Sequence, residues 1–234
     1  MAFTFKQFHI ADDQCAMKVG TDSIMLGSWS AINHTHQKIL DIGTGSGLLA
    51  IMLAQKAQGN SQIVACEFDK SAAKQALENV KITPWVKQVE VINTPIQMLK
   101  QTHFDLIISN PPYFSSGQHF EPARQLARHT GELTWPVLLK EVSRRLNTAG
   151  CFECVIPADN VDSMIELASG QGLTLSAALF VKTKPTKLAK RVLLRFIKDA
   201  EPQHVLQEEV NIYTLGMEYS PEYKALCREY YLNF

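Results

Sequence analysis

The feature that most constrains the fold is a turn rich in glycine, Gly43-Thr44-Gly45-Ser46-Gly47, that stands between a strand and a helix. Residues 39–42 are mainly apolar and predict a buried strand, and apolar residues at helical spacing over 48–58 predict a helix. A second apolar run, 62–66, predicts the next strand and ends at the acid Glu67. Strand, turn, helix and strand form a βαβ unit, which predicts an α/β fold with a parallel sheet.

The turn and Glu67 together predict a binding site for a nucleoside-like ligand. Glycine takes positive φ readily and lets the backbone approach a ligand closely. Glu67 follows Gly43 by 24 positions, which suits a carboxylate that accepts both hydroxyls of a ribose. A nicotinamide-dependent domain would have a similar acid, but its usual Gly-x-Gly-x-x-Gly is absent, because Leu48 stands where the last glycine would be.

A second constraint lies after the apolar strand 104–108, where the sequence reads Asn110-Pro111-Pro112-Tyr113. The prolines end the strand, remove two backbone donors and keep Asn110 and Pro111 out of the helical region. Mostly acceptors remain there. Two acceptors that grip the N–H bonds of a planar amino group draw its nitrogen toward tetrahedral geometry, and Tyr113 offers a face for stacking. The alternative is a strand-ending turn without chemistry.

These four residues resemble the catalytic motif of S-adenosylmethionine-dependent amino-methyltransferases. The resemblance implies a class I methyltransferase fold, which is α/β with a Rossmann-like, seven-stranded mixed sheet, an antiparallel seventh strand and helices on both faces. It also implies S-adenosylmethionine as cofactor and direct displacement of its methyl group by the amine. The catalytic residues expected from the motif are Asn110, Pro111, Pro112 and Tyr113.

The same resemblance implies the cofactor contacts. Asp41 looks like the acid that organises the glycine loop and the methionine moiety. Thr21 and Asp22 match a segment near the cofactor's amino group, although a bare helix cap over 21–23 would look the same. Related enzymes have an acid after the third strand to bond the adenine, but residues 93–96 contain none, so backbone or a side-chain amide is expected to replace it. The expected contacts are Thr21, Asp22, Asp41, Gly43, Thr44, Gly45, Gly47, Glu67, Phe68, Thr94 and Asn110.

The substrate is the harder question, because this motif serves adenine N6, guanine N2 and the glutamine amide. Over nearly its whole length, including 17–27, 40–51 and 110–113, the chain resembles the bacterial tRNA1(Val) adenine N6-methyltransferases, which modify the adenine just 3′ of the anticodon. The resemblance implies tRNA as partner. Ribosomal RNA guanine N2-methylation and protein glutamine N5-methylation stay open as alternatives. Outside enzymology, the alternative is a cofactor-dependent RNA-binding module.

A basic strip on an otherwise neutral chain agrees with an RNA partner. The chain has 23 basic and 23 acidic residues, yet residues 182–195 contain six Lys or Arg and no acid. Such a strip can contact phosphates, although a solvated hairpin loop is the alternative reading. The candidates for RNA contact are Lys182, Lys184, Lys187, Lys190 and Arg191. The polar loop 114–132 is expected to form the rim of the substrate pocket.

Composition bounds the remaining possibilities. The 234 residues predict one methyltransferase domain, with 1–36 as an extension over the cofactor pocket and 37–234 as a Rossmann-like core with a C-terminal helix. Five cysteines, an odd number, do not suggest a disulfide framework, and the Cys151–Cys154 pair reads as strand packing rather than a metal site. No apolar run reaches membrane-spanning length. We expect a cytoplasmic monomer without metal or membrane contact.

Overall fold

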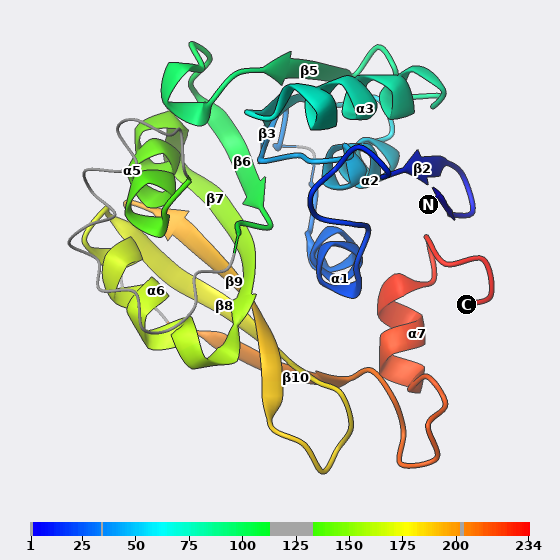
Figure 1. Ribbon diagram of the computed structural model, residues 1–234. Helices are drawn as coiled ribbons and strands as arrows, with labels where there is room; N and C mark the ends of the chain where they lie inside the picture. The colour runs from blue at the N-terminus through cyan, green and yellow to red at the C-terminus, as the bar shows by residue number, and fades with distance from the viewer. Residues whose placement is uncertain (1, 34, 113–132, 202–203) are drawn as a thin grey trace.

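The centre of the computed structural model is one mixed sheet of eight strands in the order β10-β8-β9-β7-β6-β3-β4-β5 (Figure 1). The structure describes residues 2–33, 35–112, 133–201 and 204–234. The strands are β3 (Lys38–Ile42), β4 (Gln62–Glu67), β5 (Val89–Asn93), β6 (Phe104–Ser109), β7 (Leu146–Pro157), β8 (Leu173–Lys182), β9 (Ala189–Lys198) and β10 (Leu206–Asn211).

Strand directions agree with a doubly wound sheet. From β5 to β7 all neighbours are parallel, and β9 runs antiparallel to both β7 and β8, as expected for one strand of this fold. Strand β6, which leads to Asn110, lies between β3 and β7 and is almost wholly buried. The carboxyl ends of β3, β4 and β6 therefore meet at one edge of the sheet, where ligands bind in such folds.

The predicted number of seven strands is wrong, because β10 adds an eighth. It pairs in parallel with β8 at the sheet edge. The sequence predicts only a polar link here, since Val210 is the single buried residue of Leu206–Asn211 and no apolar alternation marks the segment. Backbone pairing with an edge strand needs no buried side chains, so the sequence carries little signal for it.

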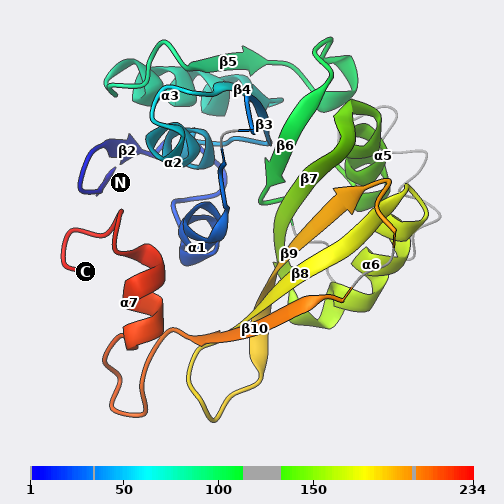
Figure 2. The ribbon, with the colours of Figure 1, turned by 180° about the vertical axis from the view of Figure 1, so that it is seen from behind.

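Helices cover both faces of the sheet, as predicted (Figures 1 and 2). One face packs against α1 (Thr21–Trp29), α2 (Leu48–Ala57), α3 (Lys70–Lys81) and α7 (Pro221–Cys227), and the other against α5 (Trp135–Arg145) and α6 (Val161–Ser169). Successive strand residues alternate between the two cores, so Ile39 belongs to one and Leu40 to the other. None of the helices in the described residues has the length and apolar character that a membrane crossing requires.

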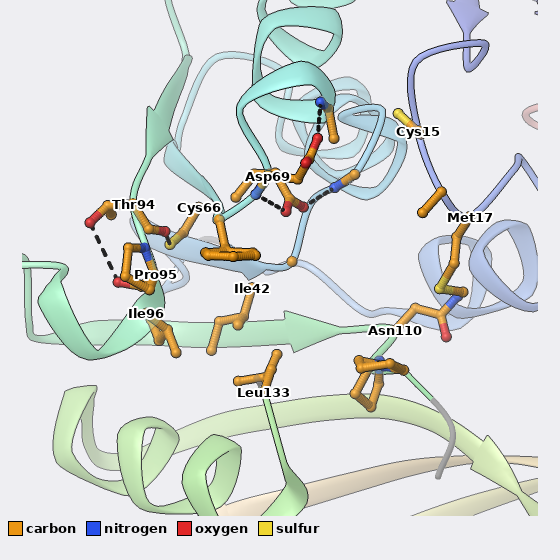
Figure 3. A pocket seen from close by; sticks show the side chains of 18 of the residues that line it. Cys15, Met17, Ile42, Cys66, Asp69, Thr94, Pro95, Ile96, Asn110 and Leu133 are labelled. Carbon is orange, nitrogen blue, oxygen red and sulfur yellow. Dashed lines mark hydrogen bonds between the residues drawn. The ribbon is translucent and has the colours of Figure 1, made fainter. Parts of the chain in front are cut away.

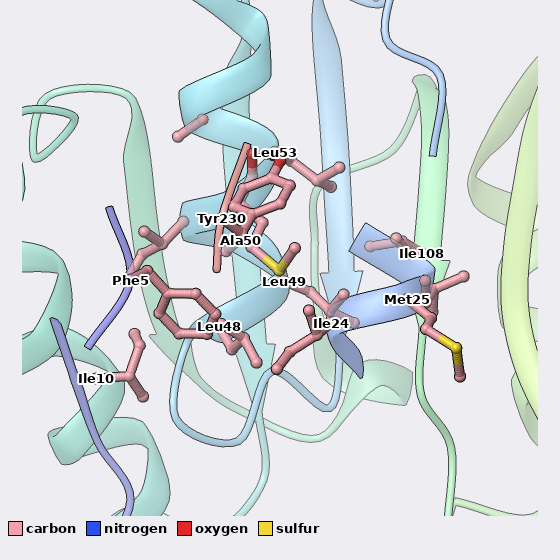
Figure 4. Packing of buried hydrophobic residues seen from close by; sticks show 14 of the residues in the cluster. Phe5, Ile10, Ile24, Met25, Leu48, Leu49, Ala50, Leu53, Ile108 and Tyr230 are labelled. Atoms are coloured by element: carbon pink, nitrogen blue, oxygen red, sulfur yellow. Dashed lines mark hydrogen bonds between the residues drawn. The ribbon is translucent and has the colours of Figure 1, made fainter. Parts of the chain in front are cut away.

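The N-terminal segment is a fixed covering over α2. Strands β1 (Ala2–Thr4) and β2 (His9–Ala11) form an antiparallel hairpin, and Phe5 and Phe8 from its turn are buried in the core. Lys6 N donates to the carbonyl of Tyr230 at 2.9 Å, and the Tyr230 hydroxyl donates to the carbonyl of Met52 in α2 at 3.0 Å. Phe5 and Tyr230 belong to the buried cluster that includes Leu48 and Leu49 of α2 (Figure 4). The two ends of the chain are thus joined on the same face.

Helix α1 includes the residues that the sequence offers as its caps. The sequence predicts that a side chain among residues 21–23 caps a helix through 24–29, but the helix starts at Thr21 with Gly20 as its N-cap. Thr21, Asp22 and Ser23 are therefore its first turn. Their side chains point outward from the helix axis and can contact other elements.

Candidate active site

A pocket of about 360 Å³ lies at the carboxyl ends of β3, β4, β5 and β6 (Figure 3). Asn110 and Met17 stand at one end of it, and Thr94, Pro95 and Ile96 at the other. The structure brings eight of the predicted site residues together in its lining, namely Gly43, Gly45, Glu67, Phe68, Thr94, Asn110, Pro111 and Pro112. Two motifs about 65 positions apart in the sequence thus share one cavity.

The glycine loop leaves open space over its backbone. Gly43 N donates to the carbonyl of Cys66 at 2.9 Å, which continues the pairing of β3 with β4. Gly43 and Gly45 have φ of +70° and +55°, and a Cβ on either would meet no atom within 4 Å. Both residues line the pocket, so the space that side chains would take belongs to the cavity. The backbone here is a cradle for a ligand that packs directly on it.

Asp41 organises the loop from beneath and does not line the pocket. It is fully buried, and its Oδ2 accepts hydrogen bonds from the Thr44 hydroxyl and from Ala50 N, the latter at 3.1 Å. Burial raises the pKa of this carboxyl to about 7, against the two hydrogen bonds, which lower it. Thr44 is buried as well, and Gly47, the N-cap of α2, has its backbone in the left-handed region at φ +85°. These three residues shape the loop from within.

Glu67 is held by backbone donors at the edge of the pocket. Its Oε2 accepts from Gly45 N at 2.8 Å and its Oε1 from Asp69 N at 2.9 Å. The Asn93 amide donates to the carbonyls of Glu67 and Phe68 at 2.9 and 3.0 Å, which holds the strand end from the other side. The carboxylate is thus fixed in orientation at the edge of the pocket. Beside it, the Phe68 side chain is 57% exposed, an apolar surface that a planar group can cover.

Asn110 stands at one end of the pocket, directly after β6. Ser109 Oγ donates to the carbonyl of Ile42 at 2.9 Å, which ties the end of β6 to the start of the glycine loop. Asn110 Nδ2 donates to Ser23 Oγ in α1 at 2.8 Å. Pro111 is buried and Pro112 is exposed. Tyr113, the predicted stacking face, and the predicted rim loop 114–132 lie outside the described residues.

Thr21 and Asp22 are near the site but do not line the pocket. Thr21 is exposed, and Asp22 Oδ2 accepts from Arg191 Nε at 2.7 Å. Arg191, one of the predicted RNA-binding residues, is therefore in an ion pair with α1. At the other end of the basic strip, Lys182 Nζ pairs with Glu209 Oε2 at 2.6 Å. Between them, Lys187 and Lys190 are exposed and Lys184 is half-buried.

Cys15, Ala16 and Met17 form a wall of the pocket, and none of them is among the expected cofactor contacts, although the resemblance to the family includes 17–27. Lys18 Nζ donates to the carbonyls of Asp12, Asp13 and Cys15 at 2.8 to 3.2 Å, which folds the segment into a compact loop. From α3, Gln75 Oε1 accepts from Gln14 N at 2.8 Å, and Asn79 bonds both Ala11 and the Ser46 carbonyl. The contacts with Gln75 and Asn79 are long-range, so no local pattern could have indicated how this loop packs on α3.

The two thiols of the pocket are unsuited to act as nucleophiles. Burial raises the pKa of Cys15 to about 11 and that of Cys66 to about 12. Both are therefore neutral thiols near pH 7, and the thiolate is the reactive form. The described residues hold no group of three or more His, Cys, Asp or Glu side chains that could bind a metal ion. Binding and orientation of a ligand remain as the functions for which the lining is suited.

Comparison with known proteins gives one family. Residues 19–159 match the model of the methyltransferase small domain. The chain is 46% identical over 233 residues to the tRNA1(Val) (adenine(37)-N6)-methyltransferase of Tolumonas auensis, covering 99% of this chain and 97% of the relative. It is 43% identical over 233 residues to the protein of the same name in Bacteroides thetaiotaomicron, with the same coverage of both chains.

Solved structures share the fold at low sequence identity. A protein of Agrobacterium tumefaciens, described as a predicted O-methyltransferase, aligns with a TM-score of 0.71 at 18% identity and covers 89% of this chain and 96% of that one. The 16S rRNA N2 G1207 methyltransferase of T. thermophilus, solved with AdoMet and guanosine, aligns with a TM-score of 0.55 at 17% identity, covering 85% and 50%. These likenesses show the class I methyltransferase fold.

Proposed function

The chain belongs to the family of bacterial tRNA1(Val) (adenine(37)-N6)-methyltransferases, and we propose that it transfers a methyl group from S-adenosylmethionine to N6 of the adenine next to the anticodon of a tRNA. One observation carries the proposal. Asn110, whose amide can bind an amine, stands at one end of the pocket that Gly43, Gly45 and Glu67 line. A donor and an acceptor of the methyl group can therefore meet inside one cavity.

The residues of the pocket fit the cofactor. The open cradle over Gly43 and Gly45 suits a ligand that packs on backbone, and the fixed carboxylate of Glu67 suits the ribose hydroxyls. Since the methyl group must reach the amine at Asn110, the base end falls to the opposite part of the pocket, near Phe68 and Thr94. There Gln97 lines the wall, and its Oε1 is buried without a hydrogen bond among the described residues. Related enzymes bond the adenine with an acid after the third strand, and we assign that role here to the Gln97 amide.

Other predicted cofactor residues act indirectly in this proposal, through the residues that line the pocket. Asp41, Thr44 and Gly47 shape the loop, and Asp22 with Thr21 belongs to the helix turn beside Asn110. Met17 stands near Asn110 in the lining and takes the place of Thr21 and Asp22 as the wall next to the reacting groups. The cofactor, when bound, supplies an activated methyl group on a sulfonium.

The chain's own part in the reaction is to hold the amine. The Asn110 side-chain oxygen and the carbonyls at Asn110 and Pro111 are acceptors, and Pro111 and Pro112 contribute no N–H that would compete. Acceptors placed on both N–H bonds turn the nitrogen lone pair toward the methyl group. Tyr113 would stack on the base. The amine becomes acidic only once it is methylated, so no side chain has to remove a proton beforehand.

The basic strip supports tRNA as the partner. Lys184, Lys187 and Lys190 stand on the β8–β9 hairpin without ion pairs among the described residues, and Arg191 connects this hairpin to the helix turn beside Asn110. Phosphate contacts along the hairpin would therefore place a bound RNA next to the pocket. A cytoplasmic location is part of the proposal, because tRNA is the substrate named for the relatives.

The test is transfer of labelled methyl groups to two tRNA1(Val) transcripts. One transcript has the natural adenine at the position named for the relatives, and the other has guanine there. We expect label in the first transcript and none in the second. Equal labelling of both would place the reaction at another nucleotide, and labelling of protein alone would favour the glutamine alternative.

A further inference from the structure

The amide of Asn110 is held by a hydroxyl from a distant part of the chain. Asn110 Nδ2 donates to Ser23 Oγ at 2.8 Å, and both side chains are half-buried. Asn110 follows β6, whereas Ser23 lies in the first turn of α1, 87 positions earlier in the chain. The contact therefore depends on the packing of α1 beside the pocket.

An asparagine amide has two unlike ends, and only one of them suits an amine substrate. The oxygen accepts hydrogen bonds, whereas the NH₂ group donates them. If the amide were rotated by half a turn, its NH₂ group would face the N–H groups of the amine, and donor would oppose donor. The bond to Ser23 engages the nitrogen end and places the oxygen on the other side of the group.

The turn that carries Ser23 is itself held on three sides. Ile24 N donates to the carbonyl of Gly20 at 3.3 Å, which closes the first helical turn. Asp22 accepts from Arg191 at 2.7 Å, which ties the turn to β9. The next four residues, 24–27, are buried against the core. Ser23 thus stands on a turn that is held by hydrogen bonds and by packing, which a group needs if it is to fix the orientation of another.

We propose that Ser23 is a positioning residue for methyl transfer, which fixes the Asn110 amide with its oxygen toward the substrate amine. The inference rests on the proposed function, because it concerns the amine that Asn110 would hold. Ser23 acts through Asn110 and does not line the pocket. Its loss should therefore lower turnover and leave the binding of cofactor and tRNA unchanged.

The first test replaces Ser23 and a matched serine. Ser23→Ala should lower kcat about 3- to 10-fold, the loss that one neutral hydrogen bond gives. The KM for tRNA, the affinity for S-adenosylmethionine by calorimetry and the melting temperature should not change. Ser23→Thr keeps the hydroxyl and should restore most of the turnover. Ser28→Ala makes the same change at a half-buried serine in the last turn of α1 and should have no effect.

The second test combines Ser23→Ala with Asn110→Ala. Once Asn110 is gone, loss of Ser23 should have no further effect, because the group that it orients is absent. Two losses that multiply would overturn the inference, and so would full turnover in Ser23→Ala, or a loss that Ser28→Ala shares. The proposed function survives each of these results. It fails separately, if the wild-type protein does not methylate tRNA at all.

Discussion

The two regions on either side of Asn110 differ in how their polar groups are held. On one side, the glycine loop and Glu67 are fixed by hydrogen bonds to backbone, and the acid that organises the loop, Asp41, is fully buried. On the other side, the β8–β9 hairpin presents charged side chains to solvent, with Leu188 at its tip 89% exposed. A preformed cradle suits a small ligand of one shape, whereas exposed charge suits a large polyanion.

This difference predicts which ligand's affinity each substitution should change. Substitutions in the cradle should affect binding of the cofactor at any ionic strength, because the site is fixed and partly buried. Substitutions in the hairpin should affect the affinity for tRNA in a manner that depends on salt. Asn110, which stands between them, should affect neither affinity strongly and the rate most.

The largest effect is expected at Asn110 itself. Asn110→Ala removes a polar group aimed at the reacting amine, and loss of one such preorganised group costs about 10²–10³ in kcat. The affinities for S-adenosylmethionine and tRNA should stay near those of the wild type. Single-turnover methyl transfer with calorimetry of both ligands checks this, and a loss of affinity without a loss of rate would assign Asn110 to binding alone.

Glu67 should give the next largest effect, confined to the cradle side. A hydrogen bond to a charged group contributes about 1.5–3 kcal/mol, so Glu67→Ala should weaken S-adenosylmethionine binding about 10- to 100-fold. Glu90→Ala, an exposed acid on the neighbouring strand β5, is the matched control. Calorimetry measures both. If the two variants bind the cofactor equally well, Glu67 has no part in ribose recognition.

The hairpin lysines should give a smaller effect on the other side. Replacing Lys184, Lys187 and Lys190 with alanine should weaken tRNA binding and reduce the slope of log affinity against log salt by about 1 for each phosphate that the variant no longer neutralises. Binding of S-adenosylmethionine should not change. The control replaces three exposed lysines away from the hairpin, Lys81, Lys87 and Lys100. Equal slopes in the two variants would favour a merely solvated hairpin.

Asp41 should affect stability with little direct effect on turnover. Its pKa is raised from 3.8 to about 7 by burial, so between these values the folded state binds more protons than the unfolded state. Its contribution to the free energy of unfolding is therefore full below the unfolded pKa and falls as pH rises toward 7. Asp41→Asn should flatten the fall between pH 4 and pH 7, measured by urea unfolding. An unchanged pH profile would mean that Asp41 titrates normally.

The sequence predicted the local parts of this molecule well. The glycine turn and the Asn-Pro-Pro segment each carry their information in a few adjacent residues, because backbone conformation and strand ends are local properties. The structure places Gly43, Gly45 and Asn110 in one cavity, which the order of the strands in an α/β sheet predicts. Asp69 caps α3 by accepting a hydrogen bond from Ala72 N at 2.8 Å, which is again a contact between near neighbours in the sequence.

The features that the sequence did not predict depend on long-range contacts, which leave no local pattern. Ser23 meets Asn110 across 87 positions, and Arg191 meets Asp22 across 169. Strand β10 forms through backbone pairing at a sheet edge, where side chains stay exposed. In each case the partner is chosen by tertiary packing, and a residue's type alone does not name it.

We propose that the protein methylates an adenine in RNA, with Asn110 holding the amine and the cradle holding the cofactor. The most direct test incubates the protein with labelled S-adenosylmethionine and unmodified bulk tRNA, digests the product to nucleosides and identifies the labelled one by mass. We predict N6-methyladenosine, which disappears with Asn110→Ala. A labelled N2-methylguanosine, or label in protein and none in RNA, would contradict the claim.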